Sequence, residues 1–266
     1  MSPAIRRSIG HALLLTLLLF CYCNVVSAES RSVTVKDARP VAKAVEALET
    51  IFRWPITYED PPYVHESEMV DVTAQVRRDQ QNSKRVMIPR EGSFSFTYDV
   101  PSWQSESVGI EASTALQAAT AGAIAEVLRS YSAARGANMF TVIEDKGLFH
   151  VVPTQFIGAS GGLEIAKPLL DTTISVLPKQ RTGVDLVNEF CQSLTLATSQ
   201  TVIPGSIPRK LLANHVTTIT ATNETARSVL SQFLGELSDD LSWQVFYDPG
   251  LRWYVLNIHV VPGTKK

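Results

Sequence analysis

Apolar residues recur along the chain with two different spacings, and the two spacings alternate in the same order twice. In ARPVAKAVEALETIF (38–52), apolar residues return every three or four positions, which is the spacing of one face of a helix. In GSFSFTYDV (92–100), aromatic residues alternate with small polar ones, which is typical of a half-buried strand. The pattern therefore predicts a chain that mixes helices and strands.

The first series of elements has the order β-α-β-β-α-β-β. Strands and helices are expected at 32–37, 38–52, 55–59, 92–100 and 114–134, and a closing hairpin at 138–153. Asp37 is expected to cap the first helix, and Pro40 suits its first turn. Asp145, Lys146 and Gly147 are expected to form the turn of the hairpin.

The second series follows a stretch rich in Gly and Pro, GASGG to KPLLD, which we expect to be a linker at 158–171. Its elements are expected at 173–180, 183–194, 201–207, 215–223 and 224–237, with a closing hairpin at 242–262. Thr182 and Asn223 are expected to cap the two helices. Asp248, Pro249 and Gly250 are expected to form the turn of this hairpin.

The two hairpins indicate a duplication. FTVIEDKGLFHVVP and WQVFYDPGLRWYVLNIHVVP both contain a strand, a turn with Asp and Gly, a second strand and a terminal His-Val-Val-Pro. We therefore predict an α+β fold of two tandem β-α-β-β-α-β-β modules, each a small mixed sheet covered by two helices. The predicted modules are 29–157, with an insertion at about 60–92, and 172–262, followed by a tail at 263–266.

The N-terminus has the three-part pattern of a secretory signal peptide. Arg6 and Arg7 precede the apolar run ALLLTLLLFCYCNVV, and small residues follow at Ser27 and Ala28. We expect cleavage after Ala28 and a periplasmic or secreted protein with no membrane-spanning segment after cleavage. Two alternatives stay open: an uncleaved anchor, and a lipoprotein attached through one of the cysteines at 21 and 23.

Cleavage would leave Cys191 as a single cysteine, so no disulfide within the chain is expected. It would also lower Lys+Arg from 24 to 22 against 26 Asp+Glu, a net charge of about −4. Because no basic run is present, nucleic acid and anionic membrane surfaces are not expected as partners. The composition, with 45% apolar and 19% charged residues, is that of an ordinary globular protein.

One stretch, EDPPYVHESE (59–68), concentrates the residue types that metal and acid/base sites use. His65 lies near the carboxylates of Glu59, Asp60, Glu66, Glu68 and Asp71. Carboxylates with one His can hold a metal ion, but no motif of known ligand spacing is present. We interpret the stretch as a solvated or partner-facing loop after a strand that Pro61 and Pro62 end, with no catalytic, metal or cofactor-binding residue expected in the chain.

The other candidates have structural interpretations that we favour. His150 and His259 lie near the ends of the closing strands and are expected to be edge or hydrogen-bonded structural residues. Cys191 lies on the apolar face of its helix and is expected to be buried and unreactive. GASGG lacks the strand-turn-helix setting of a serine nucleophile. RVMIPREG (85–92) is expected to add a strand, and Trp103 to be either a core residue or a docking residue.

The order of elements resembles a known family. VAKAVEALETIF, WPITYE, AIAEVL and the closing hairpin, and again ISVLP to LNIHVVP, are similar to the short N-terminal (STN-like) periplasmic module of secretins and TonB-dependent receptors. The resemblance covers most of the chain but includes no diagnostic motif. It implies β-α-β units that dock onto other envelope proteins. The barrel or pore that usually follows in that family is not indicated by the pattern after residue 153.

Two classes of function therefore compete with the one that we favour, an exported, non-catalytic adaptor for outer-membrane or inner-membrane proteins. The first alternative is a small-ligand sensing protein with a pocket between the modules. The second is a metal-dependent hydrolase that uses the cluster at 59–71, which requires His65 and at least two carboxylates to meet in a pocket.

Overall fold

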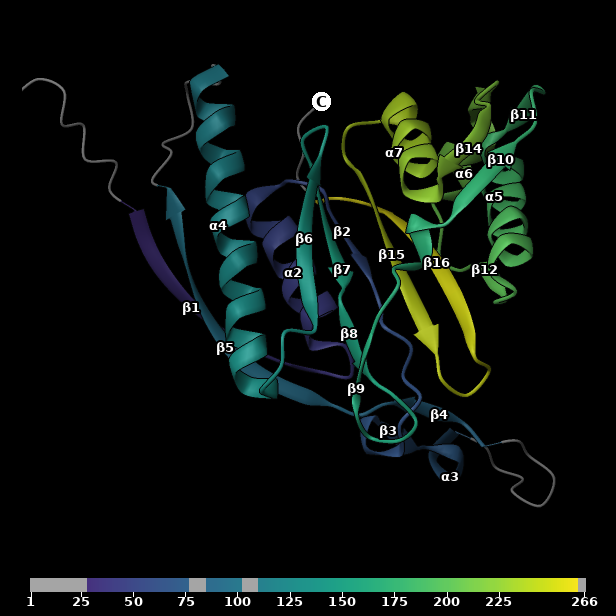
Figure 1. Cartoon of the computed structure of the whole chain (residues 1–266). Coiled ribbons are helices and arrows are strands. Elements are labelled where there is room, and N and C mark those ends of the chain that lie inside the picture. The colour runs from purple at the N-terminus through teal and green to yellow at the C-terminus, as the bar shows by residue number, and fades with distance from the viewer. Residues whose placement is uncertain (1–27, 77–84, 102–109, 263–266) are drawn as a thin grey trace, which may run out of the picture.

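The computed structural model describes residues 28–76, 85–101 and 110–262, and it confirms the α+β fold class. The main elements of both series have the predicted β-α-β-β-α-β-β order (Figure 1), with short elements added between them. The signal peptide expected at 1–28 falls almost entirely outside the described residues, as do Trp103 and the tail. Among the described residues, no helix has both the length and the apolar content needed to cross a membrane.

We call β1 to β7 the first unit and β10 to β16 the second unit. The first unit contains β1 (Ala28–Asp37), α2 (Pro40–Phe52), β2 (Ile56–Glu59), β5 (Gly92–Pro101), α4 (Ile110–Arg135), β6 (Phe140–Asp145) and β7 (Leu148–Pro153). The second contains β10 (Thr173–Val176), β11 (Arg181–Thr182), α5 (Gly183–Thr198), β12 (Val202–Pro204), α6 (Arg209–Asn214), β13 (Val216–Thr217), β14 (Ala221–Thr225), α7 (Ala226–Leu237), β15 (Leu241–Asp248) and β16 (Trp253–Val260).

The insertion of the first unit and the stretch between the units have short elements of their own. The insertion contains η1 (Glu66–Glu68), β3 (Met69–Asp71), α3 (Thr73–Val76) and β4 (Met87–Pro89). As RVMIPREG predicts, β4 is a strand, and it pairs with β3. Between the units, β8 (Gln155–Ile157) and β9 (Leu163–Ile165) form a hairpin that GASGG closes, and η2 (Leu169–Asp171) follows.

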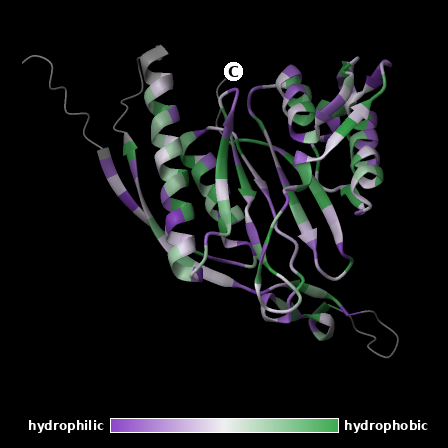
Figure 2. Cartoon of the chain, in the orientation of Figure 1, coloured by the Kyte–Doolittle hydropathy of each residue, from purple (hydrophilic) through white to green (hydrophobic). Residues whose placement is uncertain are grey.

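Each unit has three main layers: a two-stranded ribbon, a pair of long helices and one half of a central sheet; the second unit adds the short α6 and the β11–β13 pair. In the first unit, the ribbon is β1 and β5, the helices are α2 and α4, and the half-sheet is β2, β7 and β6. Figure 2 shows α4 in pale colours along most of its length, since Ala, Ser and Thr dominate it, whereas α5 and α7 combine hydrophilic and hydrophobic residues. The helices fill the space between ribbon and sheet, so each unit has a hydrophobic core of its own.

The two half-sheets join edge to edge into one six-stranded sheet, in the order β12-β16-β15-β2-β7-β6. This join was not predicted from the sequence. At the join, β15 of the second unit runs parallel to β2 of the first, with Gln244 opposite Tyr58 and Val245 opposite Glu59. The units therefore share backbone hydrogen bonds as well as side-chain contacts.

The helices of the two units lie on opposite faces of this sheet. Residues that are opposite one another in a parallel pair point to the same face. Tyr58 belongs to the core of the first unit, so Gln244 points toward α2, whereas Val245 belongs to the core of the second unit, so Glu59 points toward α7. Figure 1 shows β1, β5 and α4 on one side of the sheet and α7, α5 and β10 on the other.

Strand directions in the two halves are also reversed. Within each half, the strand after the first helix is parallel to the last strand, and the last two strands are antiparallel. Because β15 is parallel to β2, two operations superpose the second unit on the first. The first is a half-turn about an axis that lies in the sheet and runs across the strands. The second is a shift along the same axis. In this relation β2 corresponds to β12, and β6 corresponds to β15.

Three predicted helix caps have different outcomes. Thr182 caps α5, since its side chain accepts a hydrogen bond from the Asp185 N–H, as predicted. The prediction for Asn223 is wrong, because α7 begins later and Thr225 accepts from the Ser228 N–H. The prediction for Asp37 is also wrong: its carboxylate accepts from the Arg39 N–H at 2.8 Å, and α2 begins at Pro40 without a side-chain cap.

Candidate functional site

The acidic pair that ends β2 lies inside the protein. Glu59 is 1% exposed and Asp60 is 3% exposed, so the interpretation of this stretch as a solvated loop is wrong for both residues. It is also wrong for Glu68, which is buried against Arg135 with a contact of 2.7 Å. Local sequence could not reveal this burial, because the cations that pair with these acids lie far away in the chain.

Glu59 joins the first unit to the second. One of its carboxylate oxygens lies 2.5 Å from Arg227 Nη1 on α7, and the other accepts a hydrogen bond from the Leu170 N–H at 3.1 Å. Arg227 also contacts the Asp171 carboxylate at 2.7 Å. Burial raises the pKa of Glu59, and the charge of Arg227 together with the Leu170 hydrogen bond offsets part of that increase.

Asp60 makes a second set of contacts on the opposite face of the sheet. Its carboxylate lies 2.6 Å from Arg39 Nε and accepts hydrogen bonds from the Tyr247 N–H and the Tyr58 hydroxyl, each at 2.9 Å. Arg39 also donates to the Tyr247 carbonyl at 2.7 Å and lies over the Phe246 ring. Burial raises the pKa of Asp60, and Arg39 opposes that effect. Adjacent acids thus anchor opposite faces of the join.

Two histidines lie near the same join. His259 Nε2 lies 2.8 Å from the buried Glu49 carboxylate, which also accepts from the Ile56 N–H at 2.9 Å. Burial lowers the pKa of His259, but the hydrogen bond and charge of Glu49 outweigh it, so the pKa is raised overall.

His150 is fully buried in β7, an interior strand of the sheet, so of the two predicted roles it has that of a hydrogen-bonded structural residue and not that of an edge residue. Its Nδ1 bonds to the Thr57 hydroxyl at 2.7 Å, and its ring packs against Trp243 with the centroids 5.3 Å apart. Its Nε2 has no hydrogen-bond partner among the described residues. Burial, with a smaller effect of Arg227, lowers the pKa of His150 to about 4, so the ring is neutral at pH 7.

The proposed metal ligands do not converge. His65 bonds to the Ser67 hydroxyl at 2.7 Å, Asp71 accepts from Thr73, and Glu59, Asp60 and Glu68 each contact a different arginine. Within the ranges that the structure describes, no group of three or more His, Cys, Asp or Glu residues is placed to hold a metal ion. The cluster at 59–71 is therefore a set of structural ion pairs and turns.

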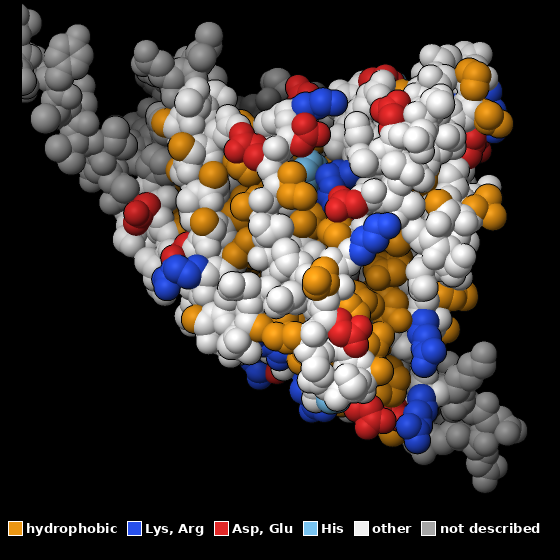
Figure 3. Space-filling model, in the orientation of Figure 1, with side chains coloured by type: hydrophobic (Ala, Val, Ile, Leu, Met, Phe, Trp, Pro, Cys, Tyr) orange, Lys and Arg blue, Asp and Glu red, His pale blue; other side chains and the backbone are white. Residues whose placement is uncertain are grey.

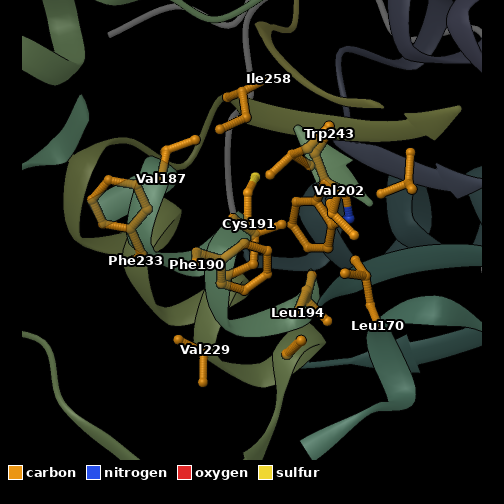
Figure 4. Close-up of a cluster of buried hydrophobic side chains, with 14 of the residues drawn as sticks. Leu170, Val187, Phe190, Cys191, Leu194, Val202, Val229, Phe233, Trp243 and Ile258 are labelled. Atoms are coloured by element: carbon orange, nitrogen blue, oxygen red, sulfur yellow. The ribbon is translucent and has the colours of Figure 1, made fainter. Parts of the chain in front are cut away.

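Cys191 is buried, as predicted, in the core of the second unit. Figure 4 shows it among Phe190, Leu194, Trp243 and Ile258. Burial raises the pKa of its thiol to about 12. Since the thiolate is the reactive form of cysteine, this side chain is unreactive at neutral pH in the folded protein.

The two outer edges of the six-stranded sheet differ. At β6, the two-residue turn makes Asp145 and Leu148 a hydrogen-bonded pair, so the backbone groups of Phe140, Val142 and Glu144 point away from β7. In the described part of the chain, these outward groups form no backbone hydrogen bond. Ile143, on the same strand, is 38% exposed. Among the described residues, no strand therefore pairs with the outer edge of β6.

The outer edge of β12 offers few free backbone donors. The outward Val202 N–H donates to the Thr195 hydroxyl of α5 at 2.9 Å. Pro204 has no N–H to offer. A neighbouring strand would therefore find few free donors on β12, whereas β6 presents a full row.

A groove of about 680 Å³ lies between the units. Its walls come from the loop after α2, the β6–β7 turn, the second half of α7 and the start of β15. The Trp54 indole N–H donates to the Gly147 carbonyl at 2.9 Å and so holds two of these walls together. Trp54 and Leu148 supply partly exposed apolar surface. Residue spacing along the chain gave no signal for this groove.

A second apolar surface lies near the tip of the last hairpin. Figure 3 shows hydrophobic side chains gathered along β15 and β16 on the face that it presents. A hollow of about 590 Å³ is lined there by β4 and by the β15–β16 hairpin, including Ile88 and Leu251, which are 39% and 51% exposed.

No family model, curated protein or solved structure matches the chain.

Proposed function

We propose that the protein is an exported, non-catalytic adaptor of the cell envelope that docks onto partner proteins through the open edge of β6. The export part of the proposal rests on the N-terminal pattern of Arg6, Arg7, an apolar run and small residues. The docking part rests on the central sheet. The resemblance to periplasmic modules of secretins and TonB-dependent receptors agrees with both parts.

One observation carries the docking proposal: the chain already uses the equivalent edge for strand pairing. β15, which corresponds to β6, receives β2 as a parallel strand, and the Asp60 N–H donates to the Val245 carbonyl at 2.8 Å. Val142 of β6 occupies the position of Val245 when the two hairpins are aligned from Asp145 and Asp248. A strand added beside Val142 would gain the same main-chain hydrogen bonds.

The chemistry of the expected partner follows from β2. Ile56 and Tyr58 point into the core on one face, and Thr57 and Glu59 point to the other face. An extended partner segment beside β6 would run parallel to it, with apolar residues at alternate positions on the face of Thr141 and Ile143, opposite α4. Affinity would come from the backbone, and specificity from the side chains beside Thr141 and Ile143.

The test places a photo-crosslinking amino acid at Ile143 in the exported protein and identifies the adducts in the envelope fraction of its source cells. We expect an adduct with an envelope protein. It should be lost in Val142→Pro, because proline removes the outward N–H and its ring blocks a neighbouring strand, whereas the bonds to β7 are kept.

Leu196→Lys is the matched control, since Leu196 is 84% exposed on α5, away from β6. This variant should keep the adduct. The docking proposal fails if the folded protein gives no adduct from position 143, or if Val142→Pro, verified as folded by circular dichroism, leaves the adduct unchanged.

One observation favours the sensing alternative: the groove between the units is lined by both of them. The hydrolase alternative has lost its specific support, because His65 does not meet the carboxylates of the 59–71 cluster.

A further inference from the structure

The groove between the units has the size of a small-molecule site. Its volume of about 680 Å³ falls in the range of ligand pockets, roughly 300 to 1,000 Å³. The partly exposed side chains of Trp54 and Leu148 line it, whereas Leu234, Leu241 and Trp243, which also border it, are buried. Aromatic and aliphatic walls of this kind bind the apolar body of a ligand.

Two cations line the groove next to the Trp54–Gly147 hydrogen bond. Arg53 and Lys146 both line it, both are exposed, and both have left-handed backbone conformations, with φ of 53° and 50°. Within the described ranges, neither side chain forms an ion pair. Asp239 also lines the groove, just after the C-terminus of α7. An anionic group would therefore lie beside Arg53 and Lys146.

A glycine keeps the groove open on the side of α7. Gly235 lies within this helix and lines the groove, and a Cβ placed there would meet no atom within 4 Å. Packing therefore does not require glycine at this position. Glycine is also the least favourable helix residue apart from proline. A larger side chain at 235 would extend into the groove and take up space that a ligand needs.

We infer that this groove binds a small amphipathic carboxylate, with an aromatic or aliphatic body against Trp54 and Leu148 and its carboxylate beside Arg53 and Lys146. This site is separate from the β6 edge and does not depend on the docking proposal. The carboxylate end supplies orientation, and the apolar walls supply most of the affinity.

The first arm of the test blocks the space. The purified protein is titrated with 2-naphthoate by isothermal calorimetry, and we expect saturable binding at one site. Gly235→Leu should abolish the binding. Gly122→Leu is the matched control, because Gly122 is also an exposed helical glycine with nothing within 4 Å of a Cβ, but it lies in α4 and does not line the groove. Melting curves should show both variants folded.

The second arm tests the charge. Arg53→Gln combined with Lys146→Gln should weaken 2-naphthoate binding by roughly tenfold, since each exposed cation contributes a modest attraction. The neutral analogue 2-naphthalenemethanol should bind both proteins equally. The inference is overturned if 2-naphthoate shows no saturable binding up to about 1 mM, if Gly235→Leu binds it as the parent does, or if the double variant loses no affinity.

Discussion

Replacing Arg227 with Met would leave Glu59 inside the protein without its cation. Met keeps a long unbranched stem, so packing changes little, but Glu59, which is 1% exposed, would retain only the Leu170 N–H. A buried carboxylate in this position takes up a proton. Protonating at pH 7 an acid whose ordinary pKa is 4.5 costs about 3 kcal/mol, at about 1.4 kcal/mol per pH unit. We therefore expect Arg227→Met to lower the free energy of unfolding by about 3 to 4 kcal/mol.

The loss should depend on pH in a defined direction. In Arg227→Met, the pKa of Glu59 is higher in the folded state than in the unfolded state, so the folded protein gains stability relative to the unfolded chain as pH falls. The loss should shrink by about 1.4 kcal/mol per pH unit as pH falls from 7 toward the pKa that Glu59 has in the folded parent, which is itself raised above 4.5.

Urea unfolding of the parent and the variant at pH 7, 6 and 5 measures the effect. Glu59→Leu combined with Arg227→Met should recover most of the stability, because no charge is then buried. Lys36→Met is the control: it removes an ion pair with Glu91 whose side chains are 70% and 57% exposed, and it should change stability by less than about 1 kcal/mol. A loss below about 1 kcal/mol for Arg227→Met at pH 7, or an equal loss at pH 5 and 7, would refute the reasoning.

Three further predictions follow from buried or capping residues. Because the pKa of His150 is lowered to about 4, the parent should lose stability as pH falls from about 6.5 to 4, by up to about 3 kcal/mol, and His150→Gln should remove that part of the pH dependence in urea unfolding. Thr225→Ala should cost about 1 kcal/mol because it removes the cap of α7, whereas Thr225→Ser keeps a capping hydroxyl and should show no capping loss; thermal melts compare the two. A thiol reagent should label Cys191 at neutral pH only at the rate at which the protein unfolds, and rapid labelling would contradict its burial.

The order of elements in both units could be predicted from the sequence because it depends on local periodicity. Alternating aromatic residues predicted β5, and helical spacing predicted α2 and α5. The Asp-x-Gly turns predicted the two closing hairpins. Each of these signals lies within a few neighbouring residues, so it can be recognised without knowing which distant residues are in contact.

The join of the units depends on partners that are distant in the chain. Glu59 pairs with Arg227 and Asp60 with Arg39, and no local pattern connects these residues. The acids follow the strand PITYE, where a carboxylate looks like the start of a solvated loop. Burial of an acid at a strand end can be predicted only when the cation that compensates it is known.

The groove and the open edge escaped prediction for a related reason. The sequence shows a glycine at 235 within a helical pattern, which by itself indicates only a locally less stable helix. Its place beside the groove depends on the residues of the first unit that lie across from it. Likewise, whether β6 or β12 lies at an edge depends on the pairing of β15 with β2, which hydrophobic spacing does not encode.

Because the two units are related by a half-turn and a shift, the two outer edges of the six-stranded sheet are different strands of the repeat. Unlike edges meet at the join, and a contact between unlike edges can be repeated without closing, as in a filament. Thr195 and Pro204 stop that repetition at β12, whereas β6 leaves it open. Further strands could therefore be added to the central sheet at β6 but not at β12. A series of sheets joined in this way would end at the β12 edge of this protein.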